Sequence, residues 1–215
     1  MPNEADMGLF RRLTEKPWLV TDVESEAPTG DMPSAAPTGL WVYFAVATVT
    51  FSLITVAYLM RMGFWHPGMA GLDWRPTPEP FLLWINTGVL VVSSMIFQRA
   101  RRAVRQGNRV SLERALYGAG LFGFAFLAGQ LVAWRELLDA GYYLTNNVAN
   151  AFFYLITTLH GLHMLGGLVA WGRTMSRLRQ GLELSKLRVA VELCAVYWHF
   201  LLIVWLGFFY LLLVT

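Results

Sequence analysis

The sequence predicts an all-α, polytopic membrane protein built as a bundle of five transmembrane helices. Of its 215 residues, 56% are hydrophobic and 14% are charged, whereas about 25% of the residues in an average soluble domain are charged. The charges also cluster and leave five uncharged runs long enough to cross a bilayer. Each run must be helical, because a backbone inside lipid has to satisfy its own hydrogen bonds and the runs lack the alternation of a barrel strand.

The chain divides into a tail and a membrane domain. Residues 1–37 hold seven of the 14 acidic residues and five of the nine prolines. Such a composition cannot bury enough apolar surface to fold alone, so we expect an extramembrane cytoplasmic tail. Residues 38–215 form the predicted five-helix domain, whose spans lie at about 40–60, 81–98, 115–134, 149–171 and 191–213.

A charge or a proline marks the boundary of each span. Arg61 ends the first uncharged run, and Pro80 precedes the second. Arg114 and Arg135 flank the third, and Arg173 ends the fourth. At ~1.5 Å per residue, the second run only just crosses a hydrocarbon core of ~30 Å.

The basic residues predict the orientation. The tail, the second connection and the fourth connection hold 14 of the 17 Lys and Arg residues. Basic loops stay in the cytoplasm, so we expect a cytoplasmic amino terminus and a periplasmic carboxyl terminus. The net charge of +3 then reflects these loops, and no nucleic-acid partner is expected. Six tryptophans lie near the predicted span ends, where an aromatic belt would place them: Trp41, Trp65, Trp74, Trp84, Trp134 and Trp171.

Polar residues inside the spans are the candidates for function, because burying them in lipid is costly. Asn86 and Gln130 are expected to form hydrogen bonds between helices. Glu192 is interpreted as a residue at a helix start that reaches the interface beside Arg188, or alternatively as a proton-handling group. The single cysteine excludes a disulfide framework and a Cys-ligated metal cluster. No nucleophile and base, carboxylate pair or phosphate loop is recognisable, so no catalytic residue is predicted.

Three histidines leave two interpretations open. His160 and His163 share a helix face, and His160 and His199 both lie near the centre of a span. They could ligate a haem iron or another metal. Alternatively, they are neutral and form hydrogen bonds across helices to Thr157, Tyr197 or backbone carbonyls. The lack of nearby carboxylates to orient metal-bound imidazoles favours the second interpretation.

Two segments closely resemble the last two helices of subunit III of haem-copper oxidases. They are residues 153–163, which end in His-Gly-Leu-His, and residues 197–200, Tyr-Trp-His-Phe, followed by Trp205. Supporting matches are Asn86-Thr87 with Ser93-Ser94, Gln130 with Trp134, and Glu192 five residues before Tyr197. The resemblance covers about residues 39–215 and indicates the short five-helix form, which lacks the first two of seven helices.

The resemblance implies a non-catalytic subunit of a respiratory terminal oxidase in a bacterial inner membrane. Such a subunit holds no haem or metal itself, packs beside catalytic subunit I and subunit II, which carry the haem and copper, supports proton uptake, and binds phospholipid between its helices. The structural or lipid-contacting candidates are Asn86, Gln130, His160, His163, Glu192, Trp198, His199 and Trp205. The alternatives are a small b-type cytochrome with bis-His haem and a transporter subunit.

Three positions depart from the family pattern. Many members carry carboxylates at the positions that are Ala47, Ala133 and Leu202 in this chain. Apolar side chains cannot exchange protons, and Glu192 is then the only carboxylate within the predicted spans. We therefore expect a chiefly stabilising subunit whose contribution to proton uptake is reduced.

Overall fold

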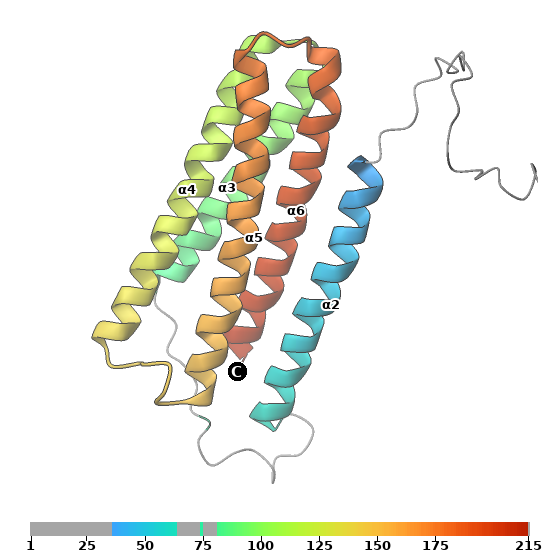
Figure 1. Ribbon diagram of the computed structural model, residues 1–215. Coiled ribbons are helices and arrows are strands. Elements are labelled where there is room, and N and C mark those ends of the chain that lie inside the picture. Colours follow the sequence, from blue (N-terminus) through green and yellow to red (C-terminus); the bar gives the residue numbers. More distant parts are fainter. Residues whose placement is uncertain (1–35, 64–73, 75–80, 215) are drawn as a thin grey trace, which may run out of the picture. The chain divides into compact units, whose positions relative to one another are not determined.

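The computed structural model describes residues 36–63, 74 and 81–214. These residues form five α-helices and no strand: α2 (Ala36–Met62), α3 (Phe81–Arg105), α4 (Arg109–Asp139), α5 (Val148–Arg179) and α6 (Leu184–Val214) (Figure 1). All five helices are long and apolar enough to cross a membrane. The prediction of an all-α protein with five spanning helices is confirmed. Residues 1–35 of the predicted tail lie outside the described residues, and residues 36 and 37 belong to α2.

The helices extend beyond the uncharged runs because the charged residues at their ends are helical too. α5 has 32 residues, about 48 Å at 1.5 Å per residue, whereas the hydrocarbon core measures about 30 Å. Asparagine side chains cap two helices. Asn108 accepts a hydrogen bond from the Ser111 amide at 2.9 Å, and Asn147 accepts one from the Ala149 amide at 3.2 Å. Such caps satisfy amide groups that lack a partner within the helix.

The helices α3 to α6 share one core. Leu90, Phe97, Leu116, Phe126 and Trp198 are fully buried there. The α3–α4 and α5–α6 connections lie at the same end of the bundle (Figure 1). Near this end, side chains join α4 to α5, because the guanidinium of Arg109 donates to the Leu178 carbonyl and that of Arg179 donates to the Tyr117 hydroxyl.

α2 packs through a single face. Phe44, Ala47, Phe51 and Tyr58 are buried, and their spacing of three, four and seven residues places them on one side of the helix. α2 contacts α5 and α6 along this face. Two of its hydroxyls bond within the helix, since Thr50 and Thr55 each donate to the carbonyl four residues earlier, both at 2.9 Å.

Glycine allows α4 and α5 to approach closely at Gly120. A Cβ atom built on Gly120 would lie 2.2 Å from a ring carbon of Trp171. The indole cannot easily move away, because its Nε1 donates to the Leu116 carbonyl at 2.8 Å.

We expect Gly120→Ala to destabilise the protein by ~1–3 kcal/mol, the usual cost of overpacking, because the methyl group must displace the Trp171 ring. Gly88→Ala is the control, since no atom lies within 4 Å of a Cβ at that position. Thermal unfolding in detergent measures both variants. Equal melting temperatures for the two would contradict the close approach of α4 and α5.

Candidate functional site

Three indole N–H groups inside the bundle donate to hydroxyls of neighbouring helices. Trp198 of α6 is fully buried, and its Nε1 donates to Ser93 Oγ of α3 at 2.9 Å. That hydroxyl donates in turn to the Ala119 carbonyl of α4 at 3.0 Å. One chain of two hydrogen bonds therefore joins three helices and leaves the indole N–H satisfied, as a buried tryptophan requires.

The same arrangement recurs one level further along α6. Trp205 Nε1 donates to Thr87 Oγ1 of α3 at 2.9 Å, and this hydroxyl donates to the Leu83 carbonyl at 2.8 Å. Trp205 and Trp198 are seven residues apart on one face of α6, and both bond to α3. These two bonds fix the register of α6 against α3.

A third chain joins α4 to α5. Trp134 Nε1 donates to Thr157 Oγ1 at 3.1 Å, and Thr157 donates to the Phe153 carbonyl at 2.7 Å. Sequence reasoning placed Trp134 and Trp171 in an aromatic belt, but both indoles form hydrogen bonds inside the bundle. Sequence reasoning missed the indole–hydroxyl bonds. The signal that could have predicted them is the set of Ser and Thr residues within the spans, because a buried indole N–H needs such an acceptor.

Asn86 and Gln130 form the predicted kind of interhelical contact. Asn86 Nδ2 of α3 donates to Gln130 Oε1 of α4 at 3.3 Å, and both side chains are buried. Glycine at position 129 makes room for this pair, because a Cβ there would lie 2.5 Å from Asn86 Oδ1. The amide pair adds one more buried polar link between α3 and α4.

The three histidines do not converge on one site. His160 is fully buried, with its ring centroid 5.0 Å from that of Trp205 and 5.7 Å from that of Phe126. The His163 ring instead lies 5.0 Å from Phe51 of α2. His199 lines a groove between α2, α3 and α6. Two axial haem ligands would have to face each other across one cavity, and these three histidines have different neighbours.

The prediction that the histidines form hydrogen bonds across helices is wrong. His163 Nδ1 donates to the Leu159 carbonyl at 2.7 Å and His199 Nδ1 donates to the Ala195 carbonyl at 2.5 Å, each within its own helix. Neither ring nitrogen of His160 has a partner among the described residues. In that part of the chain, no group of three or more His, Cys, Asp or Glu residues could hold a metal.

Glu192 lies deeper in its helix than predicted. α6 begins at Leu184, so Glu192 is two turns inside, beyond the reach of the helix dipole. Its Oε1 lies 2.8 Å from Arg105 Nε of α3 and 3.3 Å from Arg188 Nε of α6. Glu192 therefore links two helices between two guanidinium groups.

The three positions at which the family resemblance implies carboxylates, Ala47, Ala133 and Leu202, are apolar and packed against neighbouring helices. Ala47 is 3% exposed and Ala133 is fully buried. Leu202 is half-buried and packs against the main core. These side chains carry no titratable group, and Glu192 is ion-paired with Arg105.

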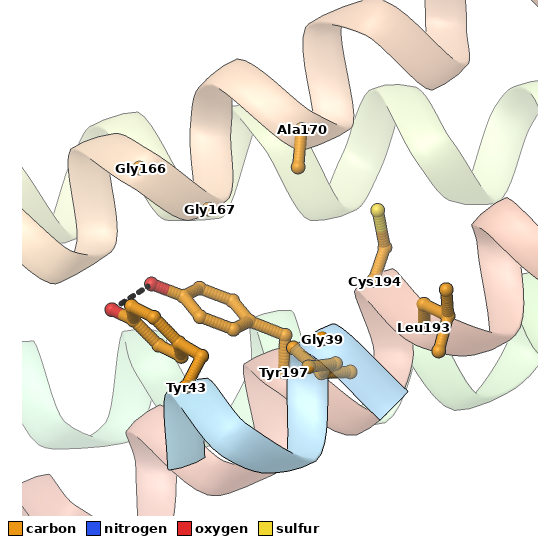
Figure 2. A pocket seen from close by; sticks show the side chains of 9 residues that line it. Gly39, Tyr43, Gly166, Gly167, Ala170, Leu193, Cys194 and Tyr197 are labelled. Carbon is orange, nitrogen blue, oxygen red and sulfur yellow. Dashed lines mark hydrogen bonds between the residues drawn. The ribbon is translucent and has the colours of Figure 1, made fainter. Parts of the chain in front are cut away.

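An apolar groove of about 420 Å³ runs between α2, α5 and α6. Small residues of α5 form one side of it, and Leu193 and Cys194 of α6 lie opposite. Figure 2 shows the rings of Tyr43 and Tyr197 side by side at one end, where their hydroxyls lie 3.1 Å apart. The Tyr197 hydroxyl also donates to the His163 carbonyl at 2.7 Å.

We expect Ser93→Ala to destabilise the protein by ~1–3 kcal/mol, because it leaves the buried Trp198 N–H without an acceptor. Trp198→Phe removes the donor as well as some packing. It should therefore destabilise the Ser93→Ala variant less than it destabilises the wild-type protein. A double-mutant cycle measured by thermal unfolding tests this coupling. Strictly additive effects would show that the indole–hydroxyl bond contributes nothing.

Comparison with known proteins identifies the family of this chain. The family model for cytochrome c oxidase subunit III matches residues 13–215. A probable cytochrome c oxidase subunit 3 of Nocardia farcinica is 32% identical over 160 residues, which cover 73% of this chain and 79% of the relative.

Two further relatives extend this likeness across bacteria. The cytochrome c oxidase subunit 3 of a Synechocystis species is 27% identical over 97% of this chain and 92% of its own length. That of Thermostichus vulcanus is 29% identical over 81% of this chain and 84% of its own length. The b-type cytochrome alternative gains no support from these likenesses. The chain therefore belongs to the cytochrome c oxidase subunit III family, and it is a multi-pass membrane subunit of a haem-copper oxidase that assembles with other subunits of that complex.

Proposed function

We propose that this chain is a non-catalytic subunit that stabilises the catalytic subunit of a respiratory terminal oxidase, which reduces oxygen to water and pumps protons. The observation that carries the proposal is the use of the buried polar groups. Trp198, Trp205 and Trp134 bond to hydroxyls of neighbouring helices, and Asn86 bonds to Gln130. These groups hold the bundle together and leave no constellation of reactive side chains among the described residues.

The partners are the catalytic subunit I and subunit II, which would hold the haem and copper. The separation of the three histidines supports assigning the haem and copper to those partners, because His160, His163 and His199 have different neighbours. The roles assigned to the candidate residues are structural: Asn86, Gln130, Trp198 and Trp205 hold helices together, while His160 and His163 fill space.

The topology has a cytoplasmic amino-terminal tail, residues 1–37, and a periplasmic carboxyl terminus, in a bacterial inner membrane. Eleven of the 17 basic residues lie in the second and fourth connections. These two connections lie at the same end of the bundle (Figure 1), where the contacts of Arg109 and Arg179 join α4 to α5. A single end of the bundle thus gathers most of the positive charge, which supports its placement in the cytoplasm.

The contribution to proton uptake is reduced in this chain. Ala47, Ala133 and Leu202 cannot exchange protons, and Glu192 lies between two guanidinium groups. Stabilisation and lipid binding remain as the main roles. The groove between α2, α5 and α6 is suited to a lipid chain, because its lining is apolar apart from the tyrosine hydroxyls.

Affinity purification of the tagged chain from its own membranes should recover subunits that contain haem and copper. We expect the His160→Leu variant to co-purify with the same amounts of both, because His160 packs against Trp205 and Phe126 without holding a metal. Visible spectra and metal analysis measure this outcome. Loss of a redox centre while the variant subunit stays bound would contradict the structural role.

A reporter fused after Thr215 tests the topology. An enzyme that is active only in the cytoplasm should be silent there, because an odd number of spans carries the carboxyl terminus to the side opposite the basic connections. The same reporter inserted at Gln106, in the α3–α4 connection, should be active. The reverse pattern would overturn the orientation and leave the subunit assignment intact.

A further inference from the structure

A second groove lies between α2, α3 and α6, and it shares no lining residue with the groove of Figure 2. Its volume is about 400 Å³. Aromatic rings form much of its wall: the centroids of Phe44 and Phe200 are 4.4 Å apart, and those of Phe44 and Trp41 are 5.8 Å apart. Trp41 and Ile203 also line the groove, and each is 68% exposed. The described part of the chain thus leaves this aromatic and aliphatic surface uncovered.

Arg101 brings a positive charge into the groove. Its Nε atom is buried and has no hydrogen-bond acceptor among the described residues. A buried donor without an acceptor costs free energy, and the cost is larger when the donor is charged. The guanidinium therefore needs an anion that enters the groove from outside this part of the chain.

The carboxylate of Glu192 is already paired with other guanidinium groups. Glu192 is the only acidic residue within the predicted spans. Its Oε1 lies 2.8 Å from Arg105 Nε and 3.3 Å from Arg188 Nε. Arg105 lies one turn beyond Arg101 on α3. The same helix therefore carries one guanidinium that is paired inside the chain and one whose buried Nε has no such partner.

Gln98 provides a second donor beside Arg101. It lies three residues earlier and lines the same groove, so both side chains share one face of α3. A guanidinium presents two parallel N–H groups, which match the two oxygens of a carboxylate. The side-chain amide of Gln98 can donate a further hydrogen bond to one of these oxygens. This face of α3 is therefore suited to a single carboxylate group.

The walls of the groove favour a protein as the carrier of this carboxylate. Aromatic residues and arginine are enriched in protein–protein interfaces, and Trp, Tyr and Arg are enriched among the residues that contribute most to binding. The groove combines Trp41, Phe44 and Phe200 with Arg101. The chain belongs to a family of oxidase subunits that assemble with other subunits. A membrane-spanning helix of one of those subunits matches both the apolar walls and the charge.

Lipid phosphates have other guanidinium groups to pair with at this end of α3. Arg99 and Arg102 are exposed and do not line the groove, so headgroups can reach them from the membrane surface. The Nε atom of Arg101 is buried and can be reached only by a group that enters the groove.

We propose that this groove docks a membrane-spanning helix of a neighbouring oxidase subunit, and that an Asp or Glu side chain of that helix pairs with Arg101. The inference rests on the function proposed above and names the contact that holds this chain in the complex. Apolar side chains of the partner helix cover Trp41, Phe200 and Ile203. A pair enclosed in this way is screened little by salt, in contrast to pairs at the membrane surface.

The Arg101→Lys variant identifies the group that faces this position. A hydrophobic carbodiimide is added to membranes that contain the intact complex. It activates a carboxyl group, the lysine amine attacks, an amide bond forms, and the carbodiimide leaves as a urea. We expect mass spectrometry of the digested complex to find a cross-link from position 101 to an Asp or Glu in a membrane-spanning segment of another subunit. Arg102→Lys is the control, and it should not form this cross-link because Arg102 is exposed outside the groove.

Removal of the charge tests how much the pair contributes to assembly. The tagged complex is washed in detergent at ~1 M salt, which screens surface pairs, and the amount of this chain that stays bound is measured. We expect Arg101→Gln to lower the retained amount at least about tenfold, because it leaves a carboxylate unpaired in the interface. Arg102→Gln should lower it less than about twofold. The isolated Arg101→Gln chain should melt no earlier than the wild-type chain, because the substitution removes a buried charge that has no partner there.

Ile203→Trp tests the apolar walls without changing the charge. Ile203 is 68% exposed, so a larger side chain fits there and fills the groove. We expect Ile203→Trp to lower the retained amount at least about tenfold. Leu121→Trp is the matched control, because Leu121 is 69% exposed and lies on α4, which does not line the groove. Its retention should stay within about twofold of the wild type.

Four results would overturn the docking site. They are a cross-linking pattern that is the same for Arg101→Lys and Arg102→Lys, equal retention of Arg101→Gln and Arg102→Gln, equal retention of the two tryptophan variants, and loss of a phospholipid from Arg101→Gln while the chain stays bound. The last result would assign the anion to a lipid phosphate. Absence of haem and copper from the wild-type complex would instead overturn the proposed function, and the cross-link would still identify the neighbour of Arg101.

Discussion

The bundle depends on one interaction, the hydrogen bond from a buried indole N–H to a hydroxyl that itself donates to a backbone carbonyl. Lipid offers no hydrophobic drive to bring helices together, so packing and polar links must do so. Trp198 and Trp205 provide large apolar surfaces and one donor each. Because both donors end on α3, through Ser93 and Thr87, α6 cannot slide or rotate against α3 without losing both bonds.

Much of the fold could be predicted because placing a charged side chain in the hydrocarbon core costs free energy. The gaps between charged residues give the number of spans, and five helices are observed. The helix ends could not be read in this way, since residues such as Arg177 and Lys186 are helical and lie outside the uncharged runs. A charge therefore marks where a helix leaves the hydrocarbon, while capping residues such as Asn108 and Asn147 mark where it begins.

The candidate site was harder to predict because the sequence shows which residues are polar but not which neighbours they meet. Asn86 and Gln130 were expected to bond between helices, and they bond to each other. The histidines were expected to do the same, but a side chain within reach of its own helix carbonyl does not need a second helix. His163 and His199 take that local option. Only a three-dimensional arrangement decides between local and interhelical partners.

The one-sided packing of α2 has a consequence for biogenesis. α2 precedes α5 and α6 in the chain, so during synthesis it enters the bilayer before either of the helices that cover its buried face. It must therefore tolerate lipid on all sides for a time. Its composition allows this, because Phe44, Ala47 and Phe51 are apolar, and Thr50 and Thr55 satisfy their hydroxyls on the carbonyls of α2 itself. The indoles that need an acceptor on a neighbouring helix, Trp198 and Trp205, lie on α6, and they find those acceptors at Ser93 and Thr87 of α3. Assembly of the bundle is thus completed only when the last helix has been inserted.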